Sequence, residues 1–176
     1  MVAEPAPQNR YLEEHIRHLL RSYRQLLGRE LEIPRGLSGP EVARWLYLEA
    51  PFPLLSHDRG PDPHFTYANR SAQRLFEMDW ETFLKTPSRL SAEPSQREER
   101  ERLLGEVRRR GYIENYRGVR ISRSGKRFWI EAVVWNLLDE EGRFLGQAAL
   151  VRRFWPAERK DHWPGVTREQ TRTRGG

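Results

Sequence analysis

The sequence has no cysteine, which excludes disulfide bonds, thiol nucleophiles, Cys-ligated zinc and cysteine-bound iron–sulfur clusters. It also has no apolar run that approaches the roughly 18 residues needed by a membrane-spanning helix. The first residues, MVAEPAPQNR, lack the apolar centre of a secretory signal peptide. We therefore expect a soluble, cytoplasmic protein that does not contact a membrane.

Short motifs typical of enzymes and metal sites are missing as well. The sequence contains no G-x-S-x-G, H-E-x-x-H, G-x-G-x-x-G or G-x-x-x-x-G-K-[ST] pattern. His15 and His18 stand one helical turn apart without an obvious third ligand, which favours a solvated helical face over a metal site. His64, just before a predicted strand, is an isolated candidate haem ligand. We expect no metal site and no enzymatic activity.

The composition is polar but not that of a disordered chain. Apolar residues make up 37% and charged residues 32%, yet six Trp, six Tyr and seven Phe are present. A chain of 176 residues is typical of one domain with extensions. Of the net charge of +6, the segment 152–176 contributes +4, since it has seven basic residues and three acids. We expect residues 156–176 to form a basic, flexible tail.

Residues 1–50 predict a helical extension of two helices. In the first, apolar residues recur at spacings of 4, 3, 4 and 3 and form one stripe that ends before Gly28. The stripe consists of Leu12, Ile16, Leu19, Tyr23 and Leu26. It serves equally well for packing on its own domain or for pairing two copies, and we expect a homodimer that uses it. The second helix follows Ser38-Gly39-Pro40-Glu41.

Residues 51–155 change from strands to helices and back to strands. Strands are predicted at 52–56 and 65–68, helices at 69–78, 80–84 and 95–111, and strands at 112–122, 127–138 and 144–154. Asn69, between the second strand and the first of these helices, is a typical N-cap. Short turns join the last three strands into an antiparallel meander. The order predicts an α+β domain with the helices on one face of a shared sheet.

Four sequence blocks in this region carry a family resemblance. They are DPHFTYANRSAQRLFEMDWETF, TPSRLSAEPSQREERERLL, GYIENYRGVRISRSGKRFWIE and WNLLDEEGRFLGQAA. Together, from Pro53 to about Phe154, they resemble the MEKHLA domain, a PAS-like module, in its free-standing bacterial type. The resemblance implies a PAS-like five-stranded antiparallel sheet with helices on one face, preceded here by the N-terminal helices. It also implies a sensory or regulatory role that depends on a ligand or on a protein partner.

The space between sheet and helices is the expected site for a small apolar or amphipathic ligand. The apolar candidates are Phe65, Tyr67, Leu75, Phe76, Trp80, Phe83, Phe128, Ile130, Val134 and Ala148. For each of them taken singly, a place in an ordinary core is the more favoured interpretation. The polar candidates are Asn69, Arg89 and Gln147.

Flavin-binding light sensors of the PAS superfamily carry a reactive cysteine followed by arginine where this chain has Ser88-Arg89. A serine cannot form the thiol adduct with flavin, which excludes that photochemistry. Flavin binding without an adduct stays open, with Arg89 at a phosphate and Gln147 at a ring carbonyl. However, Ile130 replaces the ring-binding Asn of those sensors. The cofactor is left unassigned, and a flavin- or haem-binding sensor remains an alternative.

Nucleic-acid binding is the other alternative. Arg120 and Arg127 stand on adjoining predicted strands and would line a positive groove for phosphates, together with Arg108-Arg109-Arg110 and the tail. Against it, residues 96–110 interleave six Arg with four Glu, which favours ion pairs on a solvated helix. We therefore expect a homodimeric regulatory module that binds a small molecule or a protein partner.

Overall fold

The structure is a computed structural model that describes residues 2–157, so the predicted basic tail lies outside the described residues apart from its first two. Its helices are the short 3-10 helix η1 (Pro7–Leu12), α1 (Glu13–Leu27), α2 (Gly39–Leu48), α3 (Arg70–Phe76), α4 (Trp80–Lys85), the 3-10 helix η2 (Ser88–Ser91) and α5 (Pro94–Arg110). Its strands are β1 (Leu54–Asp58), β2 (Phe65–Ala68), β3 (Tyr112–Ile121), β4 (Arg127–Leu138) and β5 (Phe144–Pro156). The predicted order of elements is confirmed.

The strands form one antiparallel sheet in the order β2-β1-β5-β4-β3. β5 lies in the centre and pairs with β1 on one side and β4 on the other. Gly146 of β5 has a φ of 151°, and a Cβ there would collide with the backbone carbonyl of His57. Only glycine lets β5 approach β1 this closely. The α+β prediction with a five-stranded sheet is confirmed.

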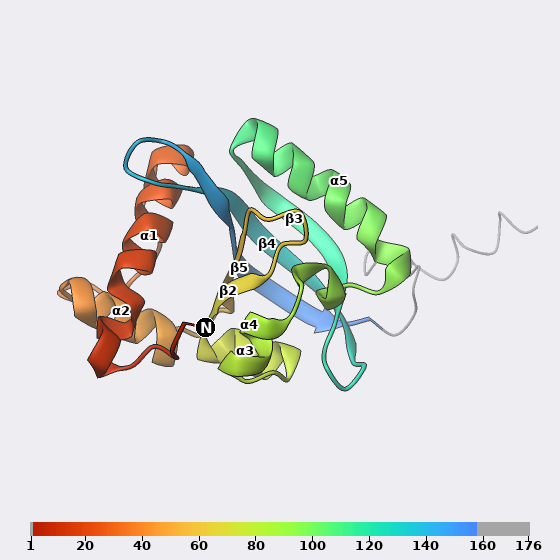
Figure 1. The fold of residues 1–176 in the computed structure, drawn as a ribbon, viewed down its shortest axis with the longest axis horizontal. Helices are drawn as coiled ribbons and strands as arrows, with labels where there is room; N and C mark the ends of the chain where they lie inside the picture. The colour runs from red at the N-terminus through yellow and green to blue at the C-terminus, as the bar shows by residue number, and fades with distance from the viewer. Residues whose placement is uncertain (1, 158–176) are drawn as a thin grey trace, which may run out of the picture.

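Helices cover both faces of this sheet. Figure 1 shows α1 and α2 to the left of the sheet and α5 to the right, with α3 and α4 at the lower end. The prediction of helices on one face holds for α3 to α5, whereas the N-terminal helices lie on the opposite face. The reason is visible in β4, where residues 130 to 137 are apolar or buried at nearly every position and need cover on both sides.

Two clusters of buried side chains result, one on each face. The first core lies between the sheet and α1 and α2, and Trp80 at the start of α4 also reaches it. It includes Ile16, Leu19, Tyr23, Leu46, Tyr47, Leu54, Tyr67, Trp80, Val133, Trp135 and Leu150. The second core, between the sheet and α3 to α5, includes Phe65, Phe76, Phe83, Val107, Tyr116, Phe128, Ile130, Val134 and Val151. Alternate residues of the same strands enter different cores, as the period of two requires.

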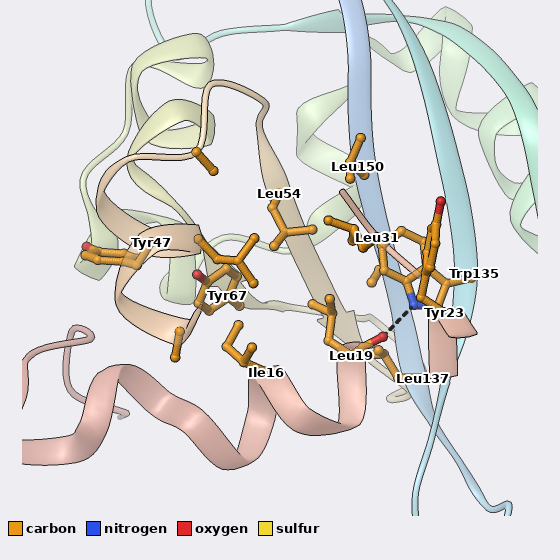
Figure 2. Close-up of a cluster of buried hydrophobic side chains, with 14 of the residues drawn as sticks. Ile16, Leu19, Tyr23, Leu31, Tyr47, Leu54, Tyr67, Trp135, Leu137 and Leu150 are labelled. Atoms are coloured by element: carbon orange, nitrogen blue, oxygen red, sulfur yellow. Dashed lines mark hydrogen bonds between the residues drawn. The ribbon is translucent and has the colours of Figure 1, made fainter. Parts of the chain in front are cut away.

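The first core fixes α1 on β4. The ring of Tyr23 meets Trp135 edge to face at 4.9 Å, and the indole N–H of Trp135 donates to the carbonyl of Leu19 at 3.2 Å (Figure 2). The hydroxyl of Ser22 accepts the backbone N–H of Leu138 at 2.8 Å. α1 is thus attached to β4 by both packing and hydrogen bonds.

The apolar stripe of the first helix is used within the chain. Ile16, Leu19 and Tyr23 are 2%, 0% and 4% exposed in the first core, while Leu12 and Leu26 are half-buried at its edge. Of the two predicted uses, packing on its own domain is the one that the structure has. Pairing of two copies through the three central residues would require α1 to leave the sheet.

Asn69 is confirmed as the N-cap of α3 and does more than cap. Its side-chain oxygen accepts the backbone N–H groups of Ala72 and Leu54, both at 3.0 Å. Its amide nitrogen donates to the carbonyls of Leu46 at 2.9 Å and Phe52 at 3.0 Å. One fully buried side chain therefore joins the end of α2, the start of β1 and the start of α3.

Candidate ligand site

A small cavity of about 50 Å³ lies in the second core, beneath α5. Its apolar wall includes Leu55, Phe65, Phe76, Leu104, Ile130 and Val134. Its polar wall includes His57, Arg100, Tyr116, Arg120 and Gln147. Because a buried water needs roughly 10–15 Å³ of such space, the cavity has room for a few waters or for one small molecule.

Arg100 reaches the cavity from α5 and is only 8% exposed. Within residues 2–157 its guanidinium donates no hydrogen bond and forms no ion pair. Burial, and next the positive charge of Arg120, lower the pKa of Arg100 to about 10. The group still carries its charge at neutral pH, so the cavity contains a cation without a counterion from the protein.

Arg120 enters from β3 and is 5% exposed. It donates to the carbonyl of Val119 at 2.7 Å and to the hydroxyl of Tyr116, over whose ring it lies at 5.5 Å. A Cβ on Gly118 would lie 2.8 Å from one guanidinium nitrogen of Arg120. Glycine at 118 therefore leaves the space in which this guanidinium rests.

His57 and Gln147 complete the polar wall. The Nδ1 of His57 lies 2.8 Å from the carbonyl oxygen of Asp58, while its buried Nε2 has no hydrogen-bond partner. Burial lowers the pKa of His57, and the positive charge of Arg100 acts in the same direction, so the ring is neutral. The amide of Gln147 donates to the carbonyl of Leu104 at 3.0 Å and so connects β5 to α5.

The lining of the cavity contains two arginines and no aspartate or glutamate. The exposed arginines of α5 are different, since Arg102 donates to Glu99 at 2.6 Å and to Glu106 at 3.0 Å. Buried cations in proteins are normally paired. This cavity is therefore a positively charged space in an otherwise apolar core.

The structure brings only part of the predicted ligand site together. Phe65, Phe76, Ile130, Val134 and Gln147 line the cavity. Phe83 and Phe128 belong to the second core and Leu75 packs against it, but none of these three lines the cavity.

Tyr67 and Trp80 do not line the cavity. Both are buried in the first core, where their rings meet at 5.8 Å. Ala148 also belongs to the first core, although it touches the cavity. Strict alternation would put Phe65 and Tyr67 on the same face of β2. The register of the β1–β2 pair shifts between Ser56 and His57, opposite these residues, and this irregularity lets them enter different cores.

Two of the three predicted polar contacts do not reach the cavity. The amide of Asn69 is fully used by four backbone groups. Arg89 is exposed and its Nε lies 3.0 Å from a carboxylate oxygen of Asp62. Neither side chain lines this cavity.

Sequence reasoning missed His57, Arg100 and Tyr116, and it placed Arg120 on a nucleic-acid surface. Arg120 is buried, and Arg127 is half-buried beside Glu93, so these two arginines do not form the predicted groove. The alternation of Tyr116, Gly118 and Arg120 opposite Ala132, Ile130 and Phe128 could have placed Arg120 in the core. Nothing in the sequence separates Arg100 from its exposed neighbours in α5.

His15 is also more buried than predicted. Its Nε2 lies 2.9 Å from the hydroxyl of Ser56, and burial, followed by the charge of His18, lowers the pKa of His15 to about 4. In the described part of the chain no group of three His, Asp or Glu side chains could hold a metal ion. None of the helices between residues 2 and 157 is long and apolar enough to cross a membrane.

The residues present do not fit a flavin or a haem. The cavity of about 50 Å³ is far below the roughly 300–1,000 Å³ of sites for larger ligands. Arg89 and the amide nitrogen of Gln147 are engaged elsewhere. His64 does not line the cavity, and its Nδ1 lies 2.9 Å from the carbonyl of Asp62.

Comparison with known proteins supports the fold. The sequence profile of the MEKHLA domain matches residues 13–156, a range that includes α1 and α2. None of the curated proteins matches this chain in sequence.

Solved structures of similar fold include two light-oxygen-voltage proteins. The dark structure of the blue-light photoreceptor Aureochrome1 LOV is 17% identical, with a TM-score of 0.51 over 82% of this chain and 94% of that chain. An RNA-binding light-oxygen-voltage receptor is 17% identical, with a TM-score of 0.54 over 70% of this chain and 36% of that chain. A PAS domain from Colwellia psychrerythraea is 16% identical, with a TM-score of 0.48 over 58% of this chain and 86% of that chain.

Proposed function

Because this chain belongs to the MEKHLA domain family, we propose that it is a sensory or regulatory module whose state depends on what occupies the cavity beneath α5. One observation carries the proposal: an apolar core contains a cavity lined by the guanidinium of Arg100, which makes no hydrogen bond within residues 2–157, and by the imidazole of His57. The Nε2 of His57 has no partner at hydrogen-bond distance, although Gln147 lies near enough to act on the pKa of the ring. Buried polar groups are normally hydrogen-bonded, and exceptions call for a functional or solvent partner. A small ligand supplies such a partner.

The route from the cavity to the surface is the strand β4. Asn136, two residues after the cavity residue Val134, donates to the carbonyl of Arg108 in α5 at 3.1 Å. Its neighbour Trp135 donates to Leu19 of α1 on the other face. A shift of α5 on ligand binding would therefore act on β4 at the residue next to the α1 contact. We propose that α1 and α2 are the output elements.

These helices also offer a surface for a protein partner or a second copy. An open hollow of about 430 Å³ lies between α1 and α2 and is lined by Leu20, Ile33 and Val42, with Arg17 and Arg21 at its edge. Exposed apolar hollows with a charged rim are typical of interaction sites. Output through this surface would link ligand binding to partner contact or dimerisation.

We propose binding without catalysis. The polar groups at the cavity are two guanidinium groups, a neutral imidazole, a phenol, an amide and the hydroxyls of Ser56 and Ser91. Covalent acyl transfer needs a nucleophile beside a base whose ring is oriented by a third group. The Oγ of Ser56 lies 2.9 Å from the Nε2 of His15, but within residues 2–157 no carboxylate bonds to the His15 ring.

Native mass spectrometry, thermal unfolding and hydrogen exchange test the proposal. The protein is screened with neutral and charged small molecules, and exchange is then followed in residues 13–27 and 94–110 with any compound that raises the Tm. We expect slower exchange in α5 together with altered exchange in α1. If no compound of either class binds, the ligand role is refuted. If exchange changes in α5 alone, the output through α1 is refuted.

A further inference from the structure

We propose that the cavity beneath α5 binds the carboxylate of a small organic acid, with Arg100 and Arg120 as its charge partners. The inference rests on the proposed function, because it names the ligand class for the same cavity. Three properties of the cavity support it: its positive charge, its guanidinium donors and its small volume.

The charge of the cavity is uncompensated by the protein. Arg100 and Arg120 are both more than nine-tenths buried, and no carboxylate lines the cavity. Glu101, which follows Arg100 in the chain, is exposed and does not line the cavity; its charge is the last of the causes that act on the pKa of Arg100. Removing a cation from water without a counterion is costly, and one bound anion would offset that cost for both groups. His57 is neutral and adds no charge of either sign.

The donors suit a carboxylate. A guanidinium has five N–H donors in a planar fork that matches the two oxygens of a carboxylate. Arg100 spends none of its donors on the described protein, whereas Arg120 is held in place by Val119 and Tyr116 and still has donors left. One guanidinium is thus fixed and the other is free to close on the ligand.

Size and lining restrict the remainder of the ligand. A cavity of about 50 Å³ admits only a few non-hydrogen atoms. Beyond the arginines its wall is formed by Phe65, Phe76 and Ile130, which suits a short alkyl group. A two- to four-carbon monocarboxylate combines both requirements, whereas inorganic phosphate would leave the apolar wall without a contact.

The test measures the Tm of the protein at constant ionic strength with acetate, propionate and butyrate, with the amides acetamide and propionamide, and with phosphate and chloride. A ligand that binds only the folded state raises the Tm, by about 5–10 °C at a hundredfold excess over its Kd for a chain of this size. We expect such a rise with at least one monocarboxylate and none with its amide or with chloride.

Four variants locate the site. Arg100→Gln and Arg120→Gln should each weaken carboxylate binding about tenfold or more, the loss typical of one charged hydrogen bond. Arg100→Lys keeps the charge but loses the fork, and Gly118→Ala displaces the guanidinium of Arg120 without changing any charge. Both should also weaken binding, and they keep the test intact if a Gln variant does not fold. Arg109→Gln, on the exposed side of the same helix, is the matched control and should bind like the original protein.

The outcomes separate this inference from the proposed function. Carboxylate binding that is lost in the cavity variants and kept in Arg109→Gln supports the inference. Equal stabilisation by amides and acids overturns it and leaves a neutral ligand for the proposed sensor. Stabilisation by phosphate alone overturns the carboxylate assignment. If nothing in either series binds and native mass spectrometry detects no bound molecule, both the inference and the ligand role fail.

Discussion

Val134 and Trp135 are neighbours on β4, yet their side chains enter very different surroundings. Trp135 lies in the first core against Tyr23, and its N–H has a partner in Leu19. Val134 borders a cavity whose cations have no counterion. In the first core the buried polar side-chain atoms have hydrogen-bond partners, with the hydroxyl of Tyr67 as the exception. We therefore assign this core to stability. The second core leaves strong donors unused, as binding sites do.

The contrast between the two cores is tested most strongly by replacing Trp135 in the first core. We expect Trp135→Ala to lower the free energy of unfolding by about 3–5 kcal/mol, because it opens a large hole between α1 and β4. The measurement is urea unfolding followed by circular dichroism. Trp45→Ala, at a half-buried position on α2, is the control and should cost clearly less. Equal losses would mean that the first core is not the main source of stability.

The next largest effect is expected at Asn69. Asn69→Ala leaves two backbone N–H groups and two carbonyls without their partner, and we expect a loss of about 2–4 kcal/mol. Ser95→Ala, in the exposed first turn of α5, is the control and should change stability little. A loss at Asn69 no larger than that of the control would contradict its role as a junction.

Acid should weaken the first core through His15. Its folded pKa of about 4 lies below the ordinary value of 6.5, so the unfolded chain gains a proton that the folded chain does not take up. The contribution of neutral His15 to the free energy of unfolding is full above pH 6.5 and is lost as the pH falls toward 4. The loss is about 2 kcal/mol between pH 7 and 5. His57 acts in the same direction in the second core.

Unfolding in urea across this pH range checks the effect. His15→Gln should reduce the loss of stability on acidification, whereas His64→Gln, in the loop before β2, should leave it unchanged. A pH dependence that is the same in His15→Gln and in the original protein would assign the effect to other groups.

The smallest change, and the most telling for the comparison, concerns Arg100. Without ligand, we expect Arg100→Leu to leave stability unchanged or to raise it by about 1 kcal/mol, since it removes an uncompensated buried charge. The same urea titration measures it, and Arg109→Leu is the exposed control. A loss of several kcal/mol would show that Arg100 is structural, and the contrast between the two cores would then disappear.

The sequence predicts the fold better than the site, and the reason is physical. Strand and helix periods, the cap at Asn69 and the turns are local properties, and the structure agrees with them closely. Which core a strand residue enters depends on register and on what covers the second face, and these are set by distant segments. Tyr67 and Trp80 were misplaced for that reason, since α1 and α2 supply their cover.

The burial of Arg100 could not be predicted from the sequence for a different reason. In α5 it stands among arginines and glutamates that look alike in sequence, and the helix has no pronounced apolar face. Its burial comes from the way α5 lies across β3 and β4, which only the assembled structure shows. Arg120 was more accessible to prediction, because its alternation with Tyr116 in β3 is a local pattern.

The contacts of α1 and of Asn69 differ in one more respect, which concerns the order of folding. The most distant partner of Asn69 is 23 residues away along the chain, whereas Trp135 and Leu19 are 116 residues apart. Because the entropy lost on closing a loop grows with the logarithm of its length, docking α1 costs about 1.4 kcal/mol more chain entropy than closing the corner at Asn69. The corner can therefore form early from nearby residues, and α1 regains more chain freedom on detaching than the corner does on opening.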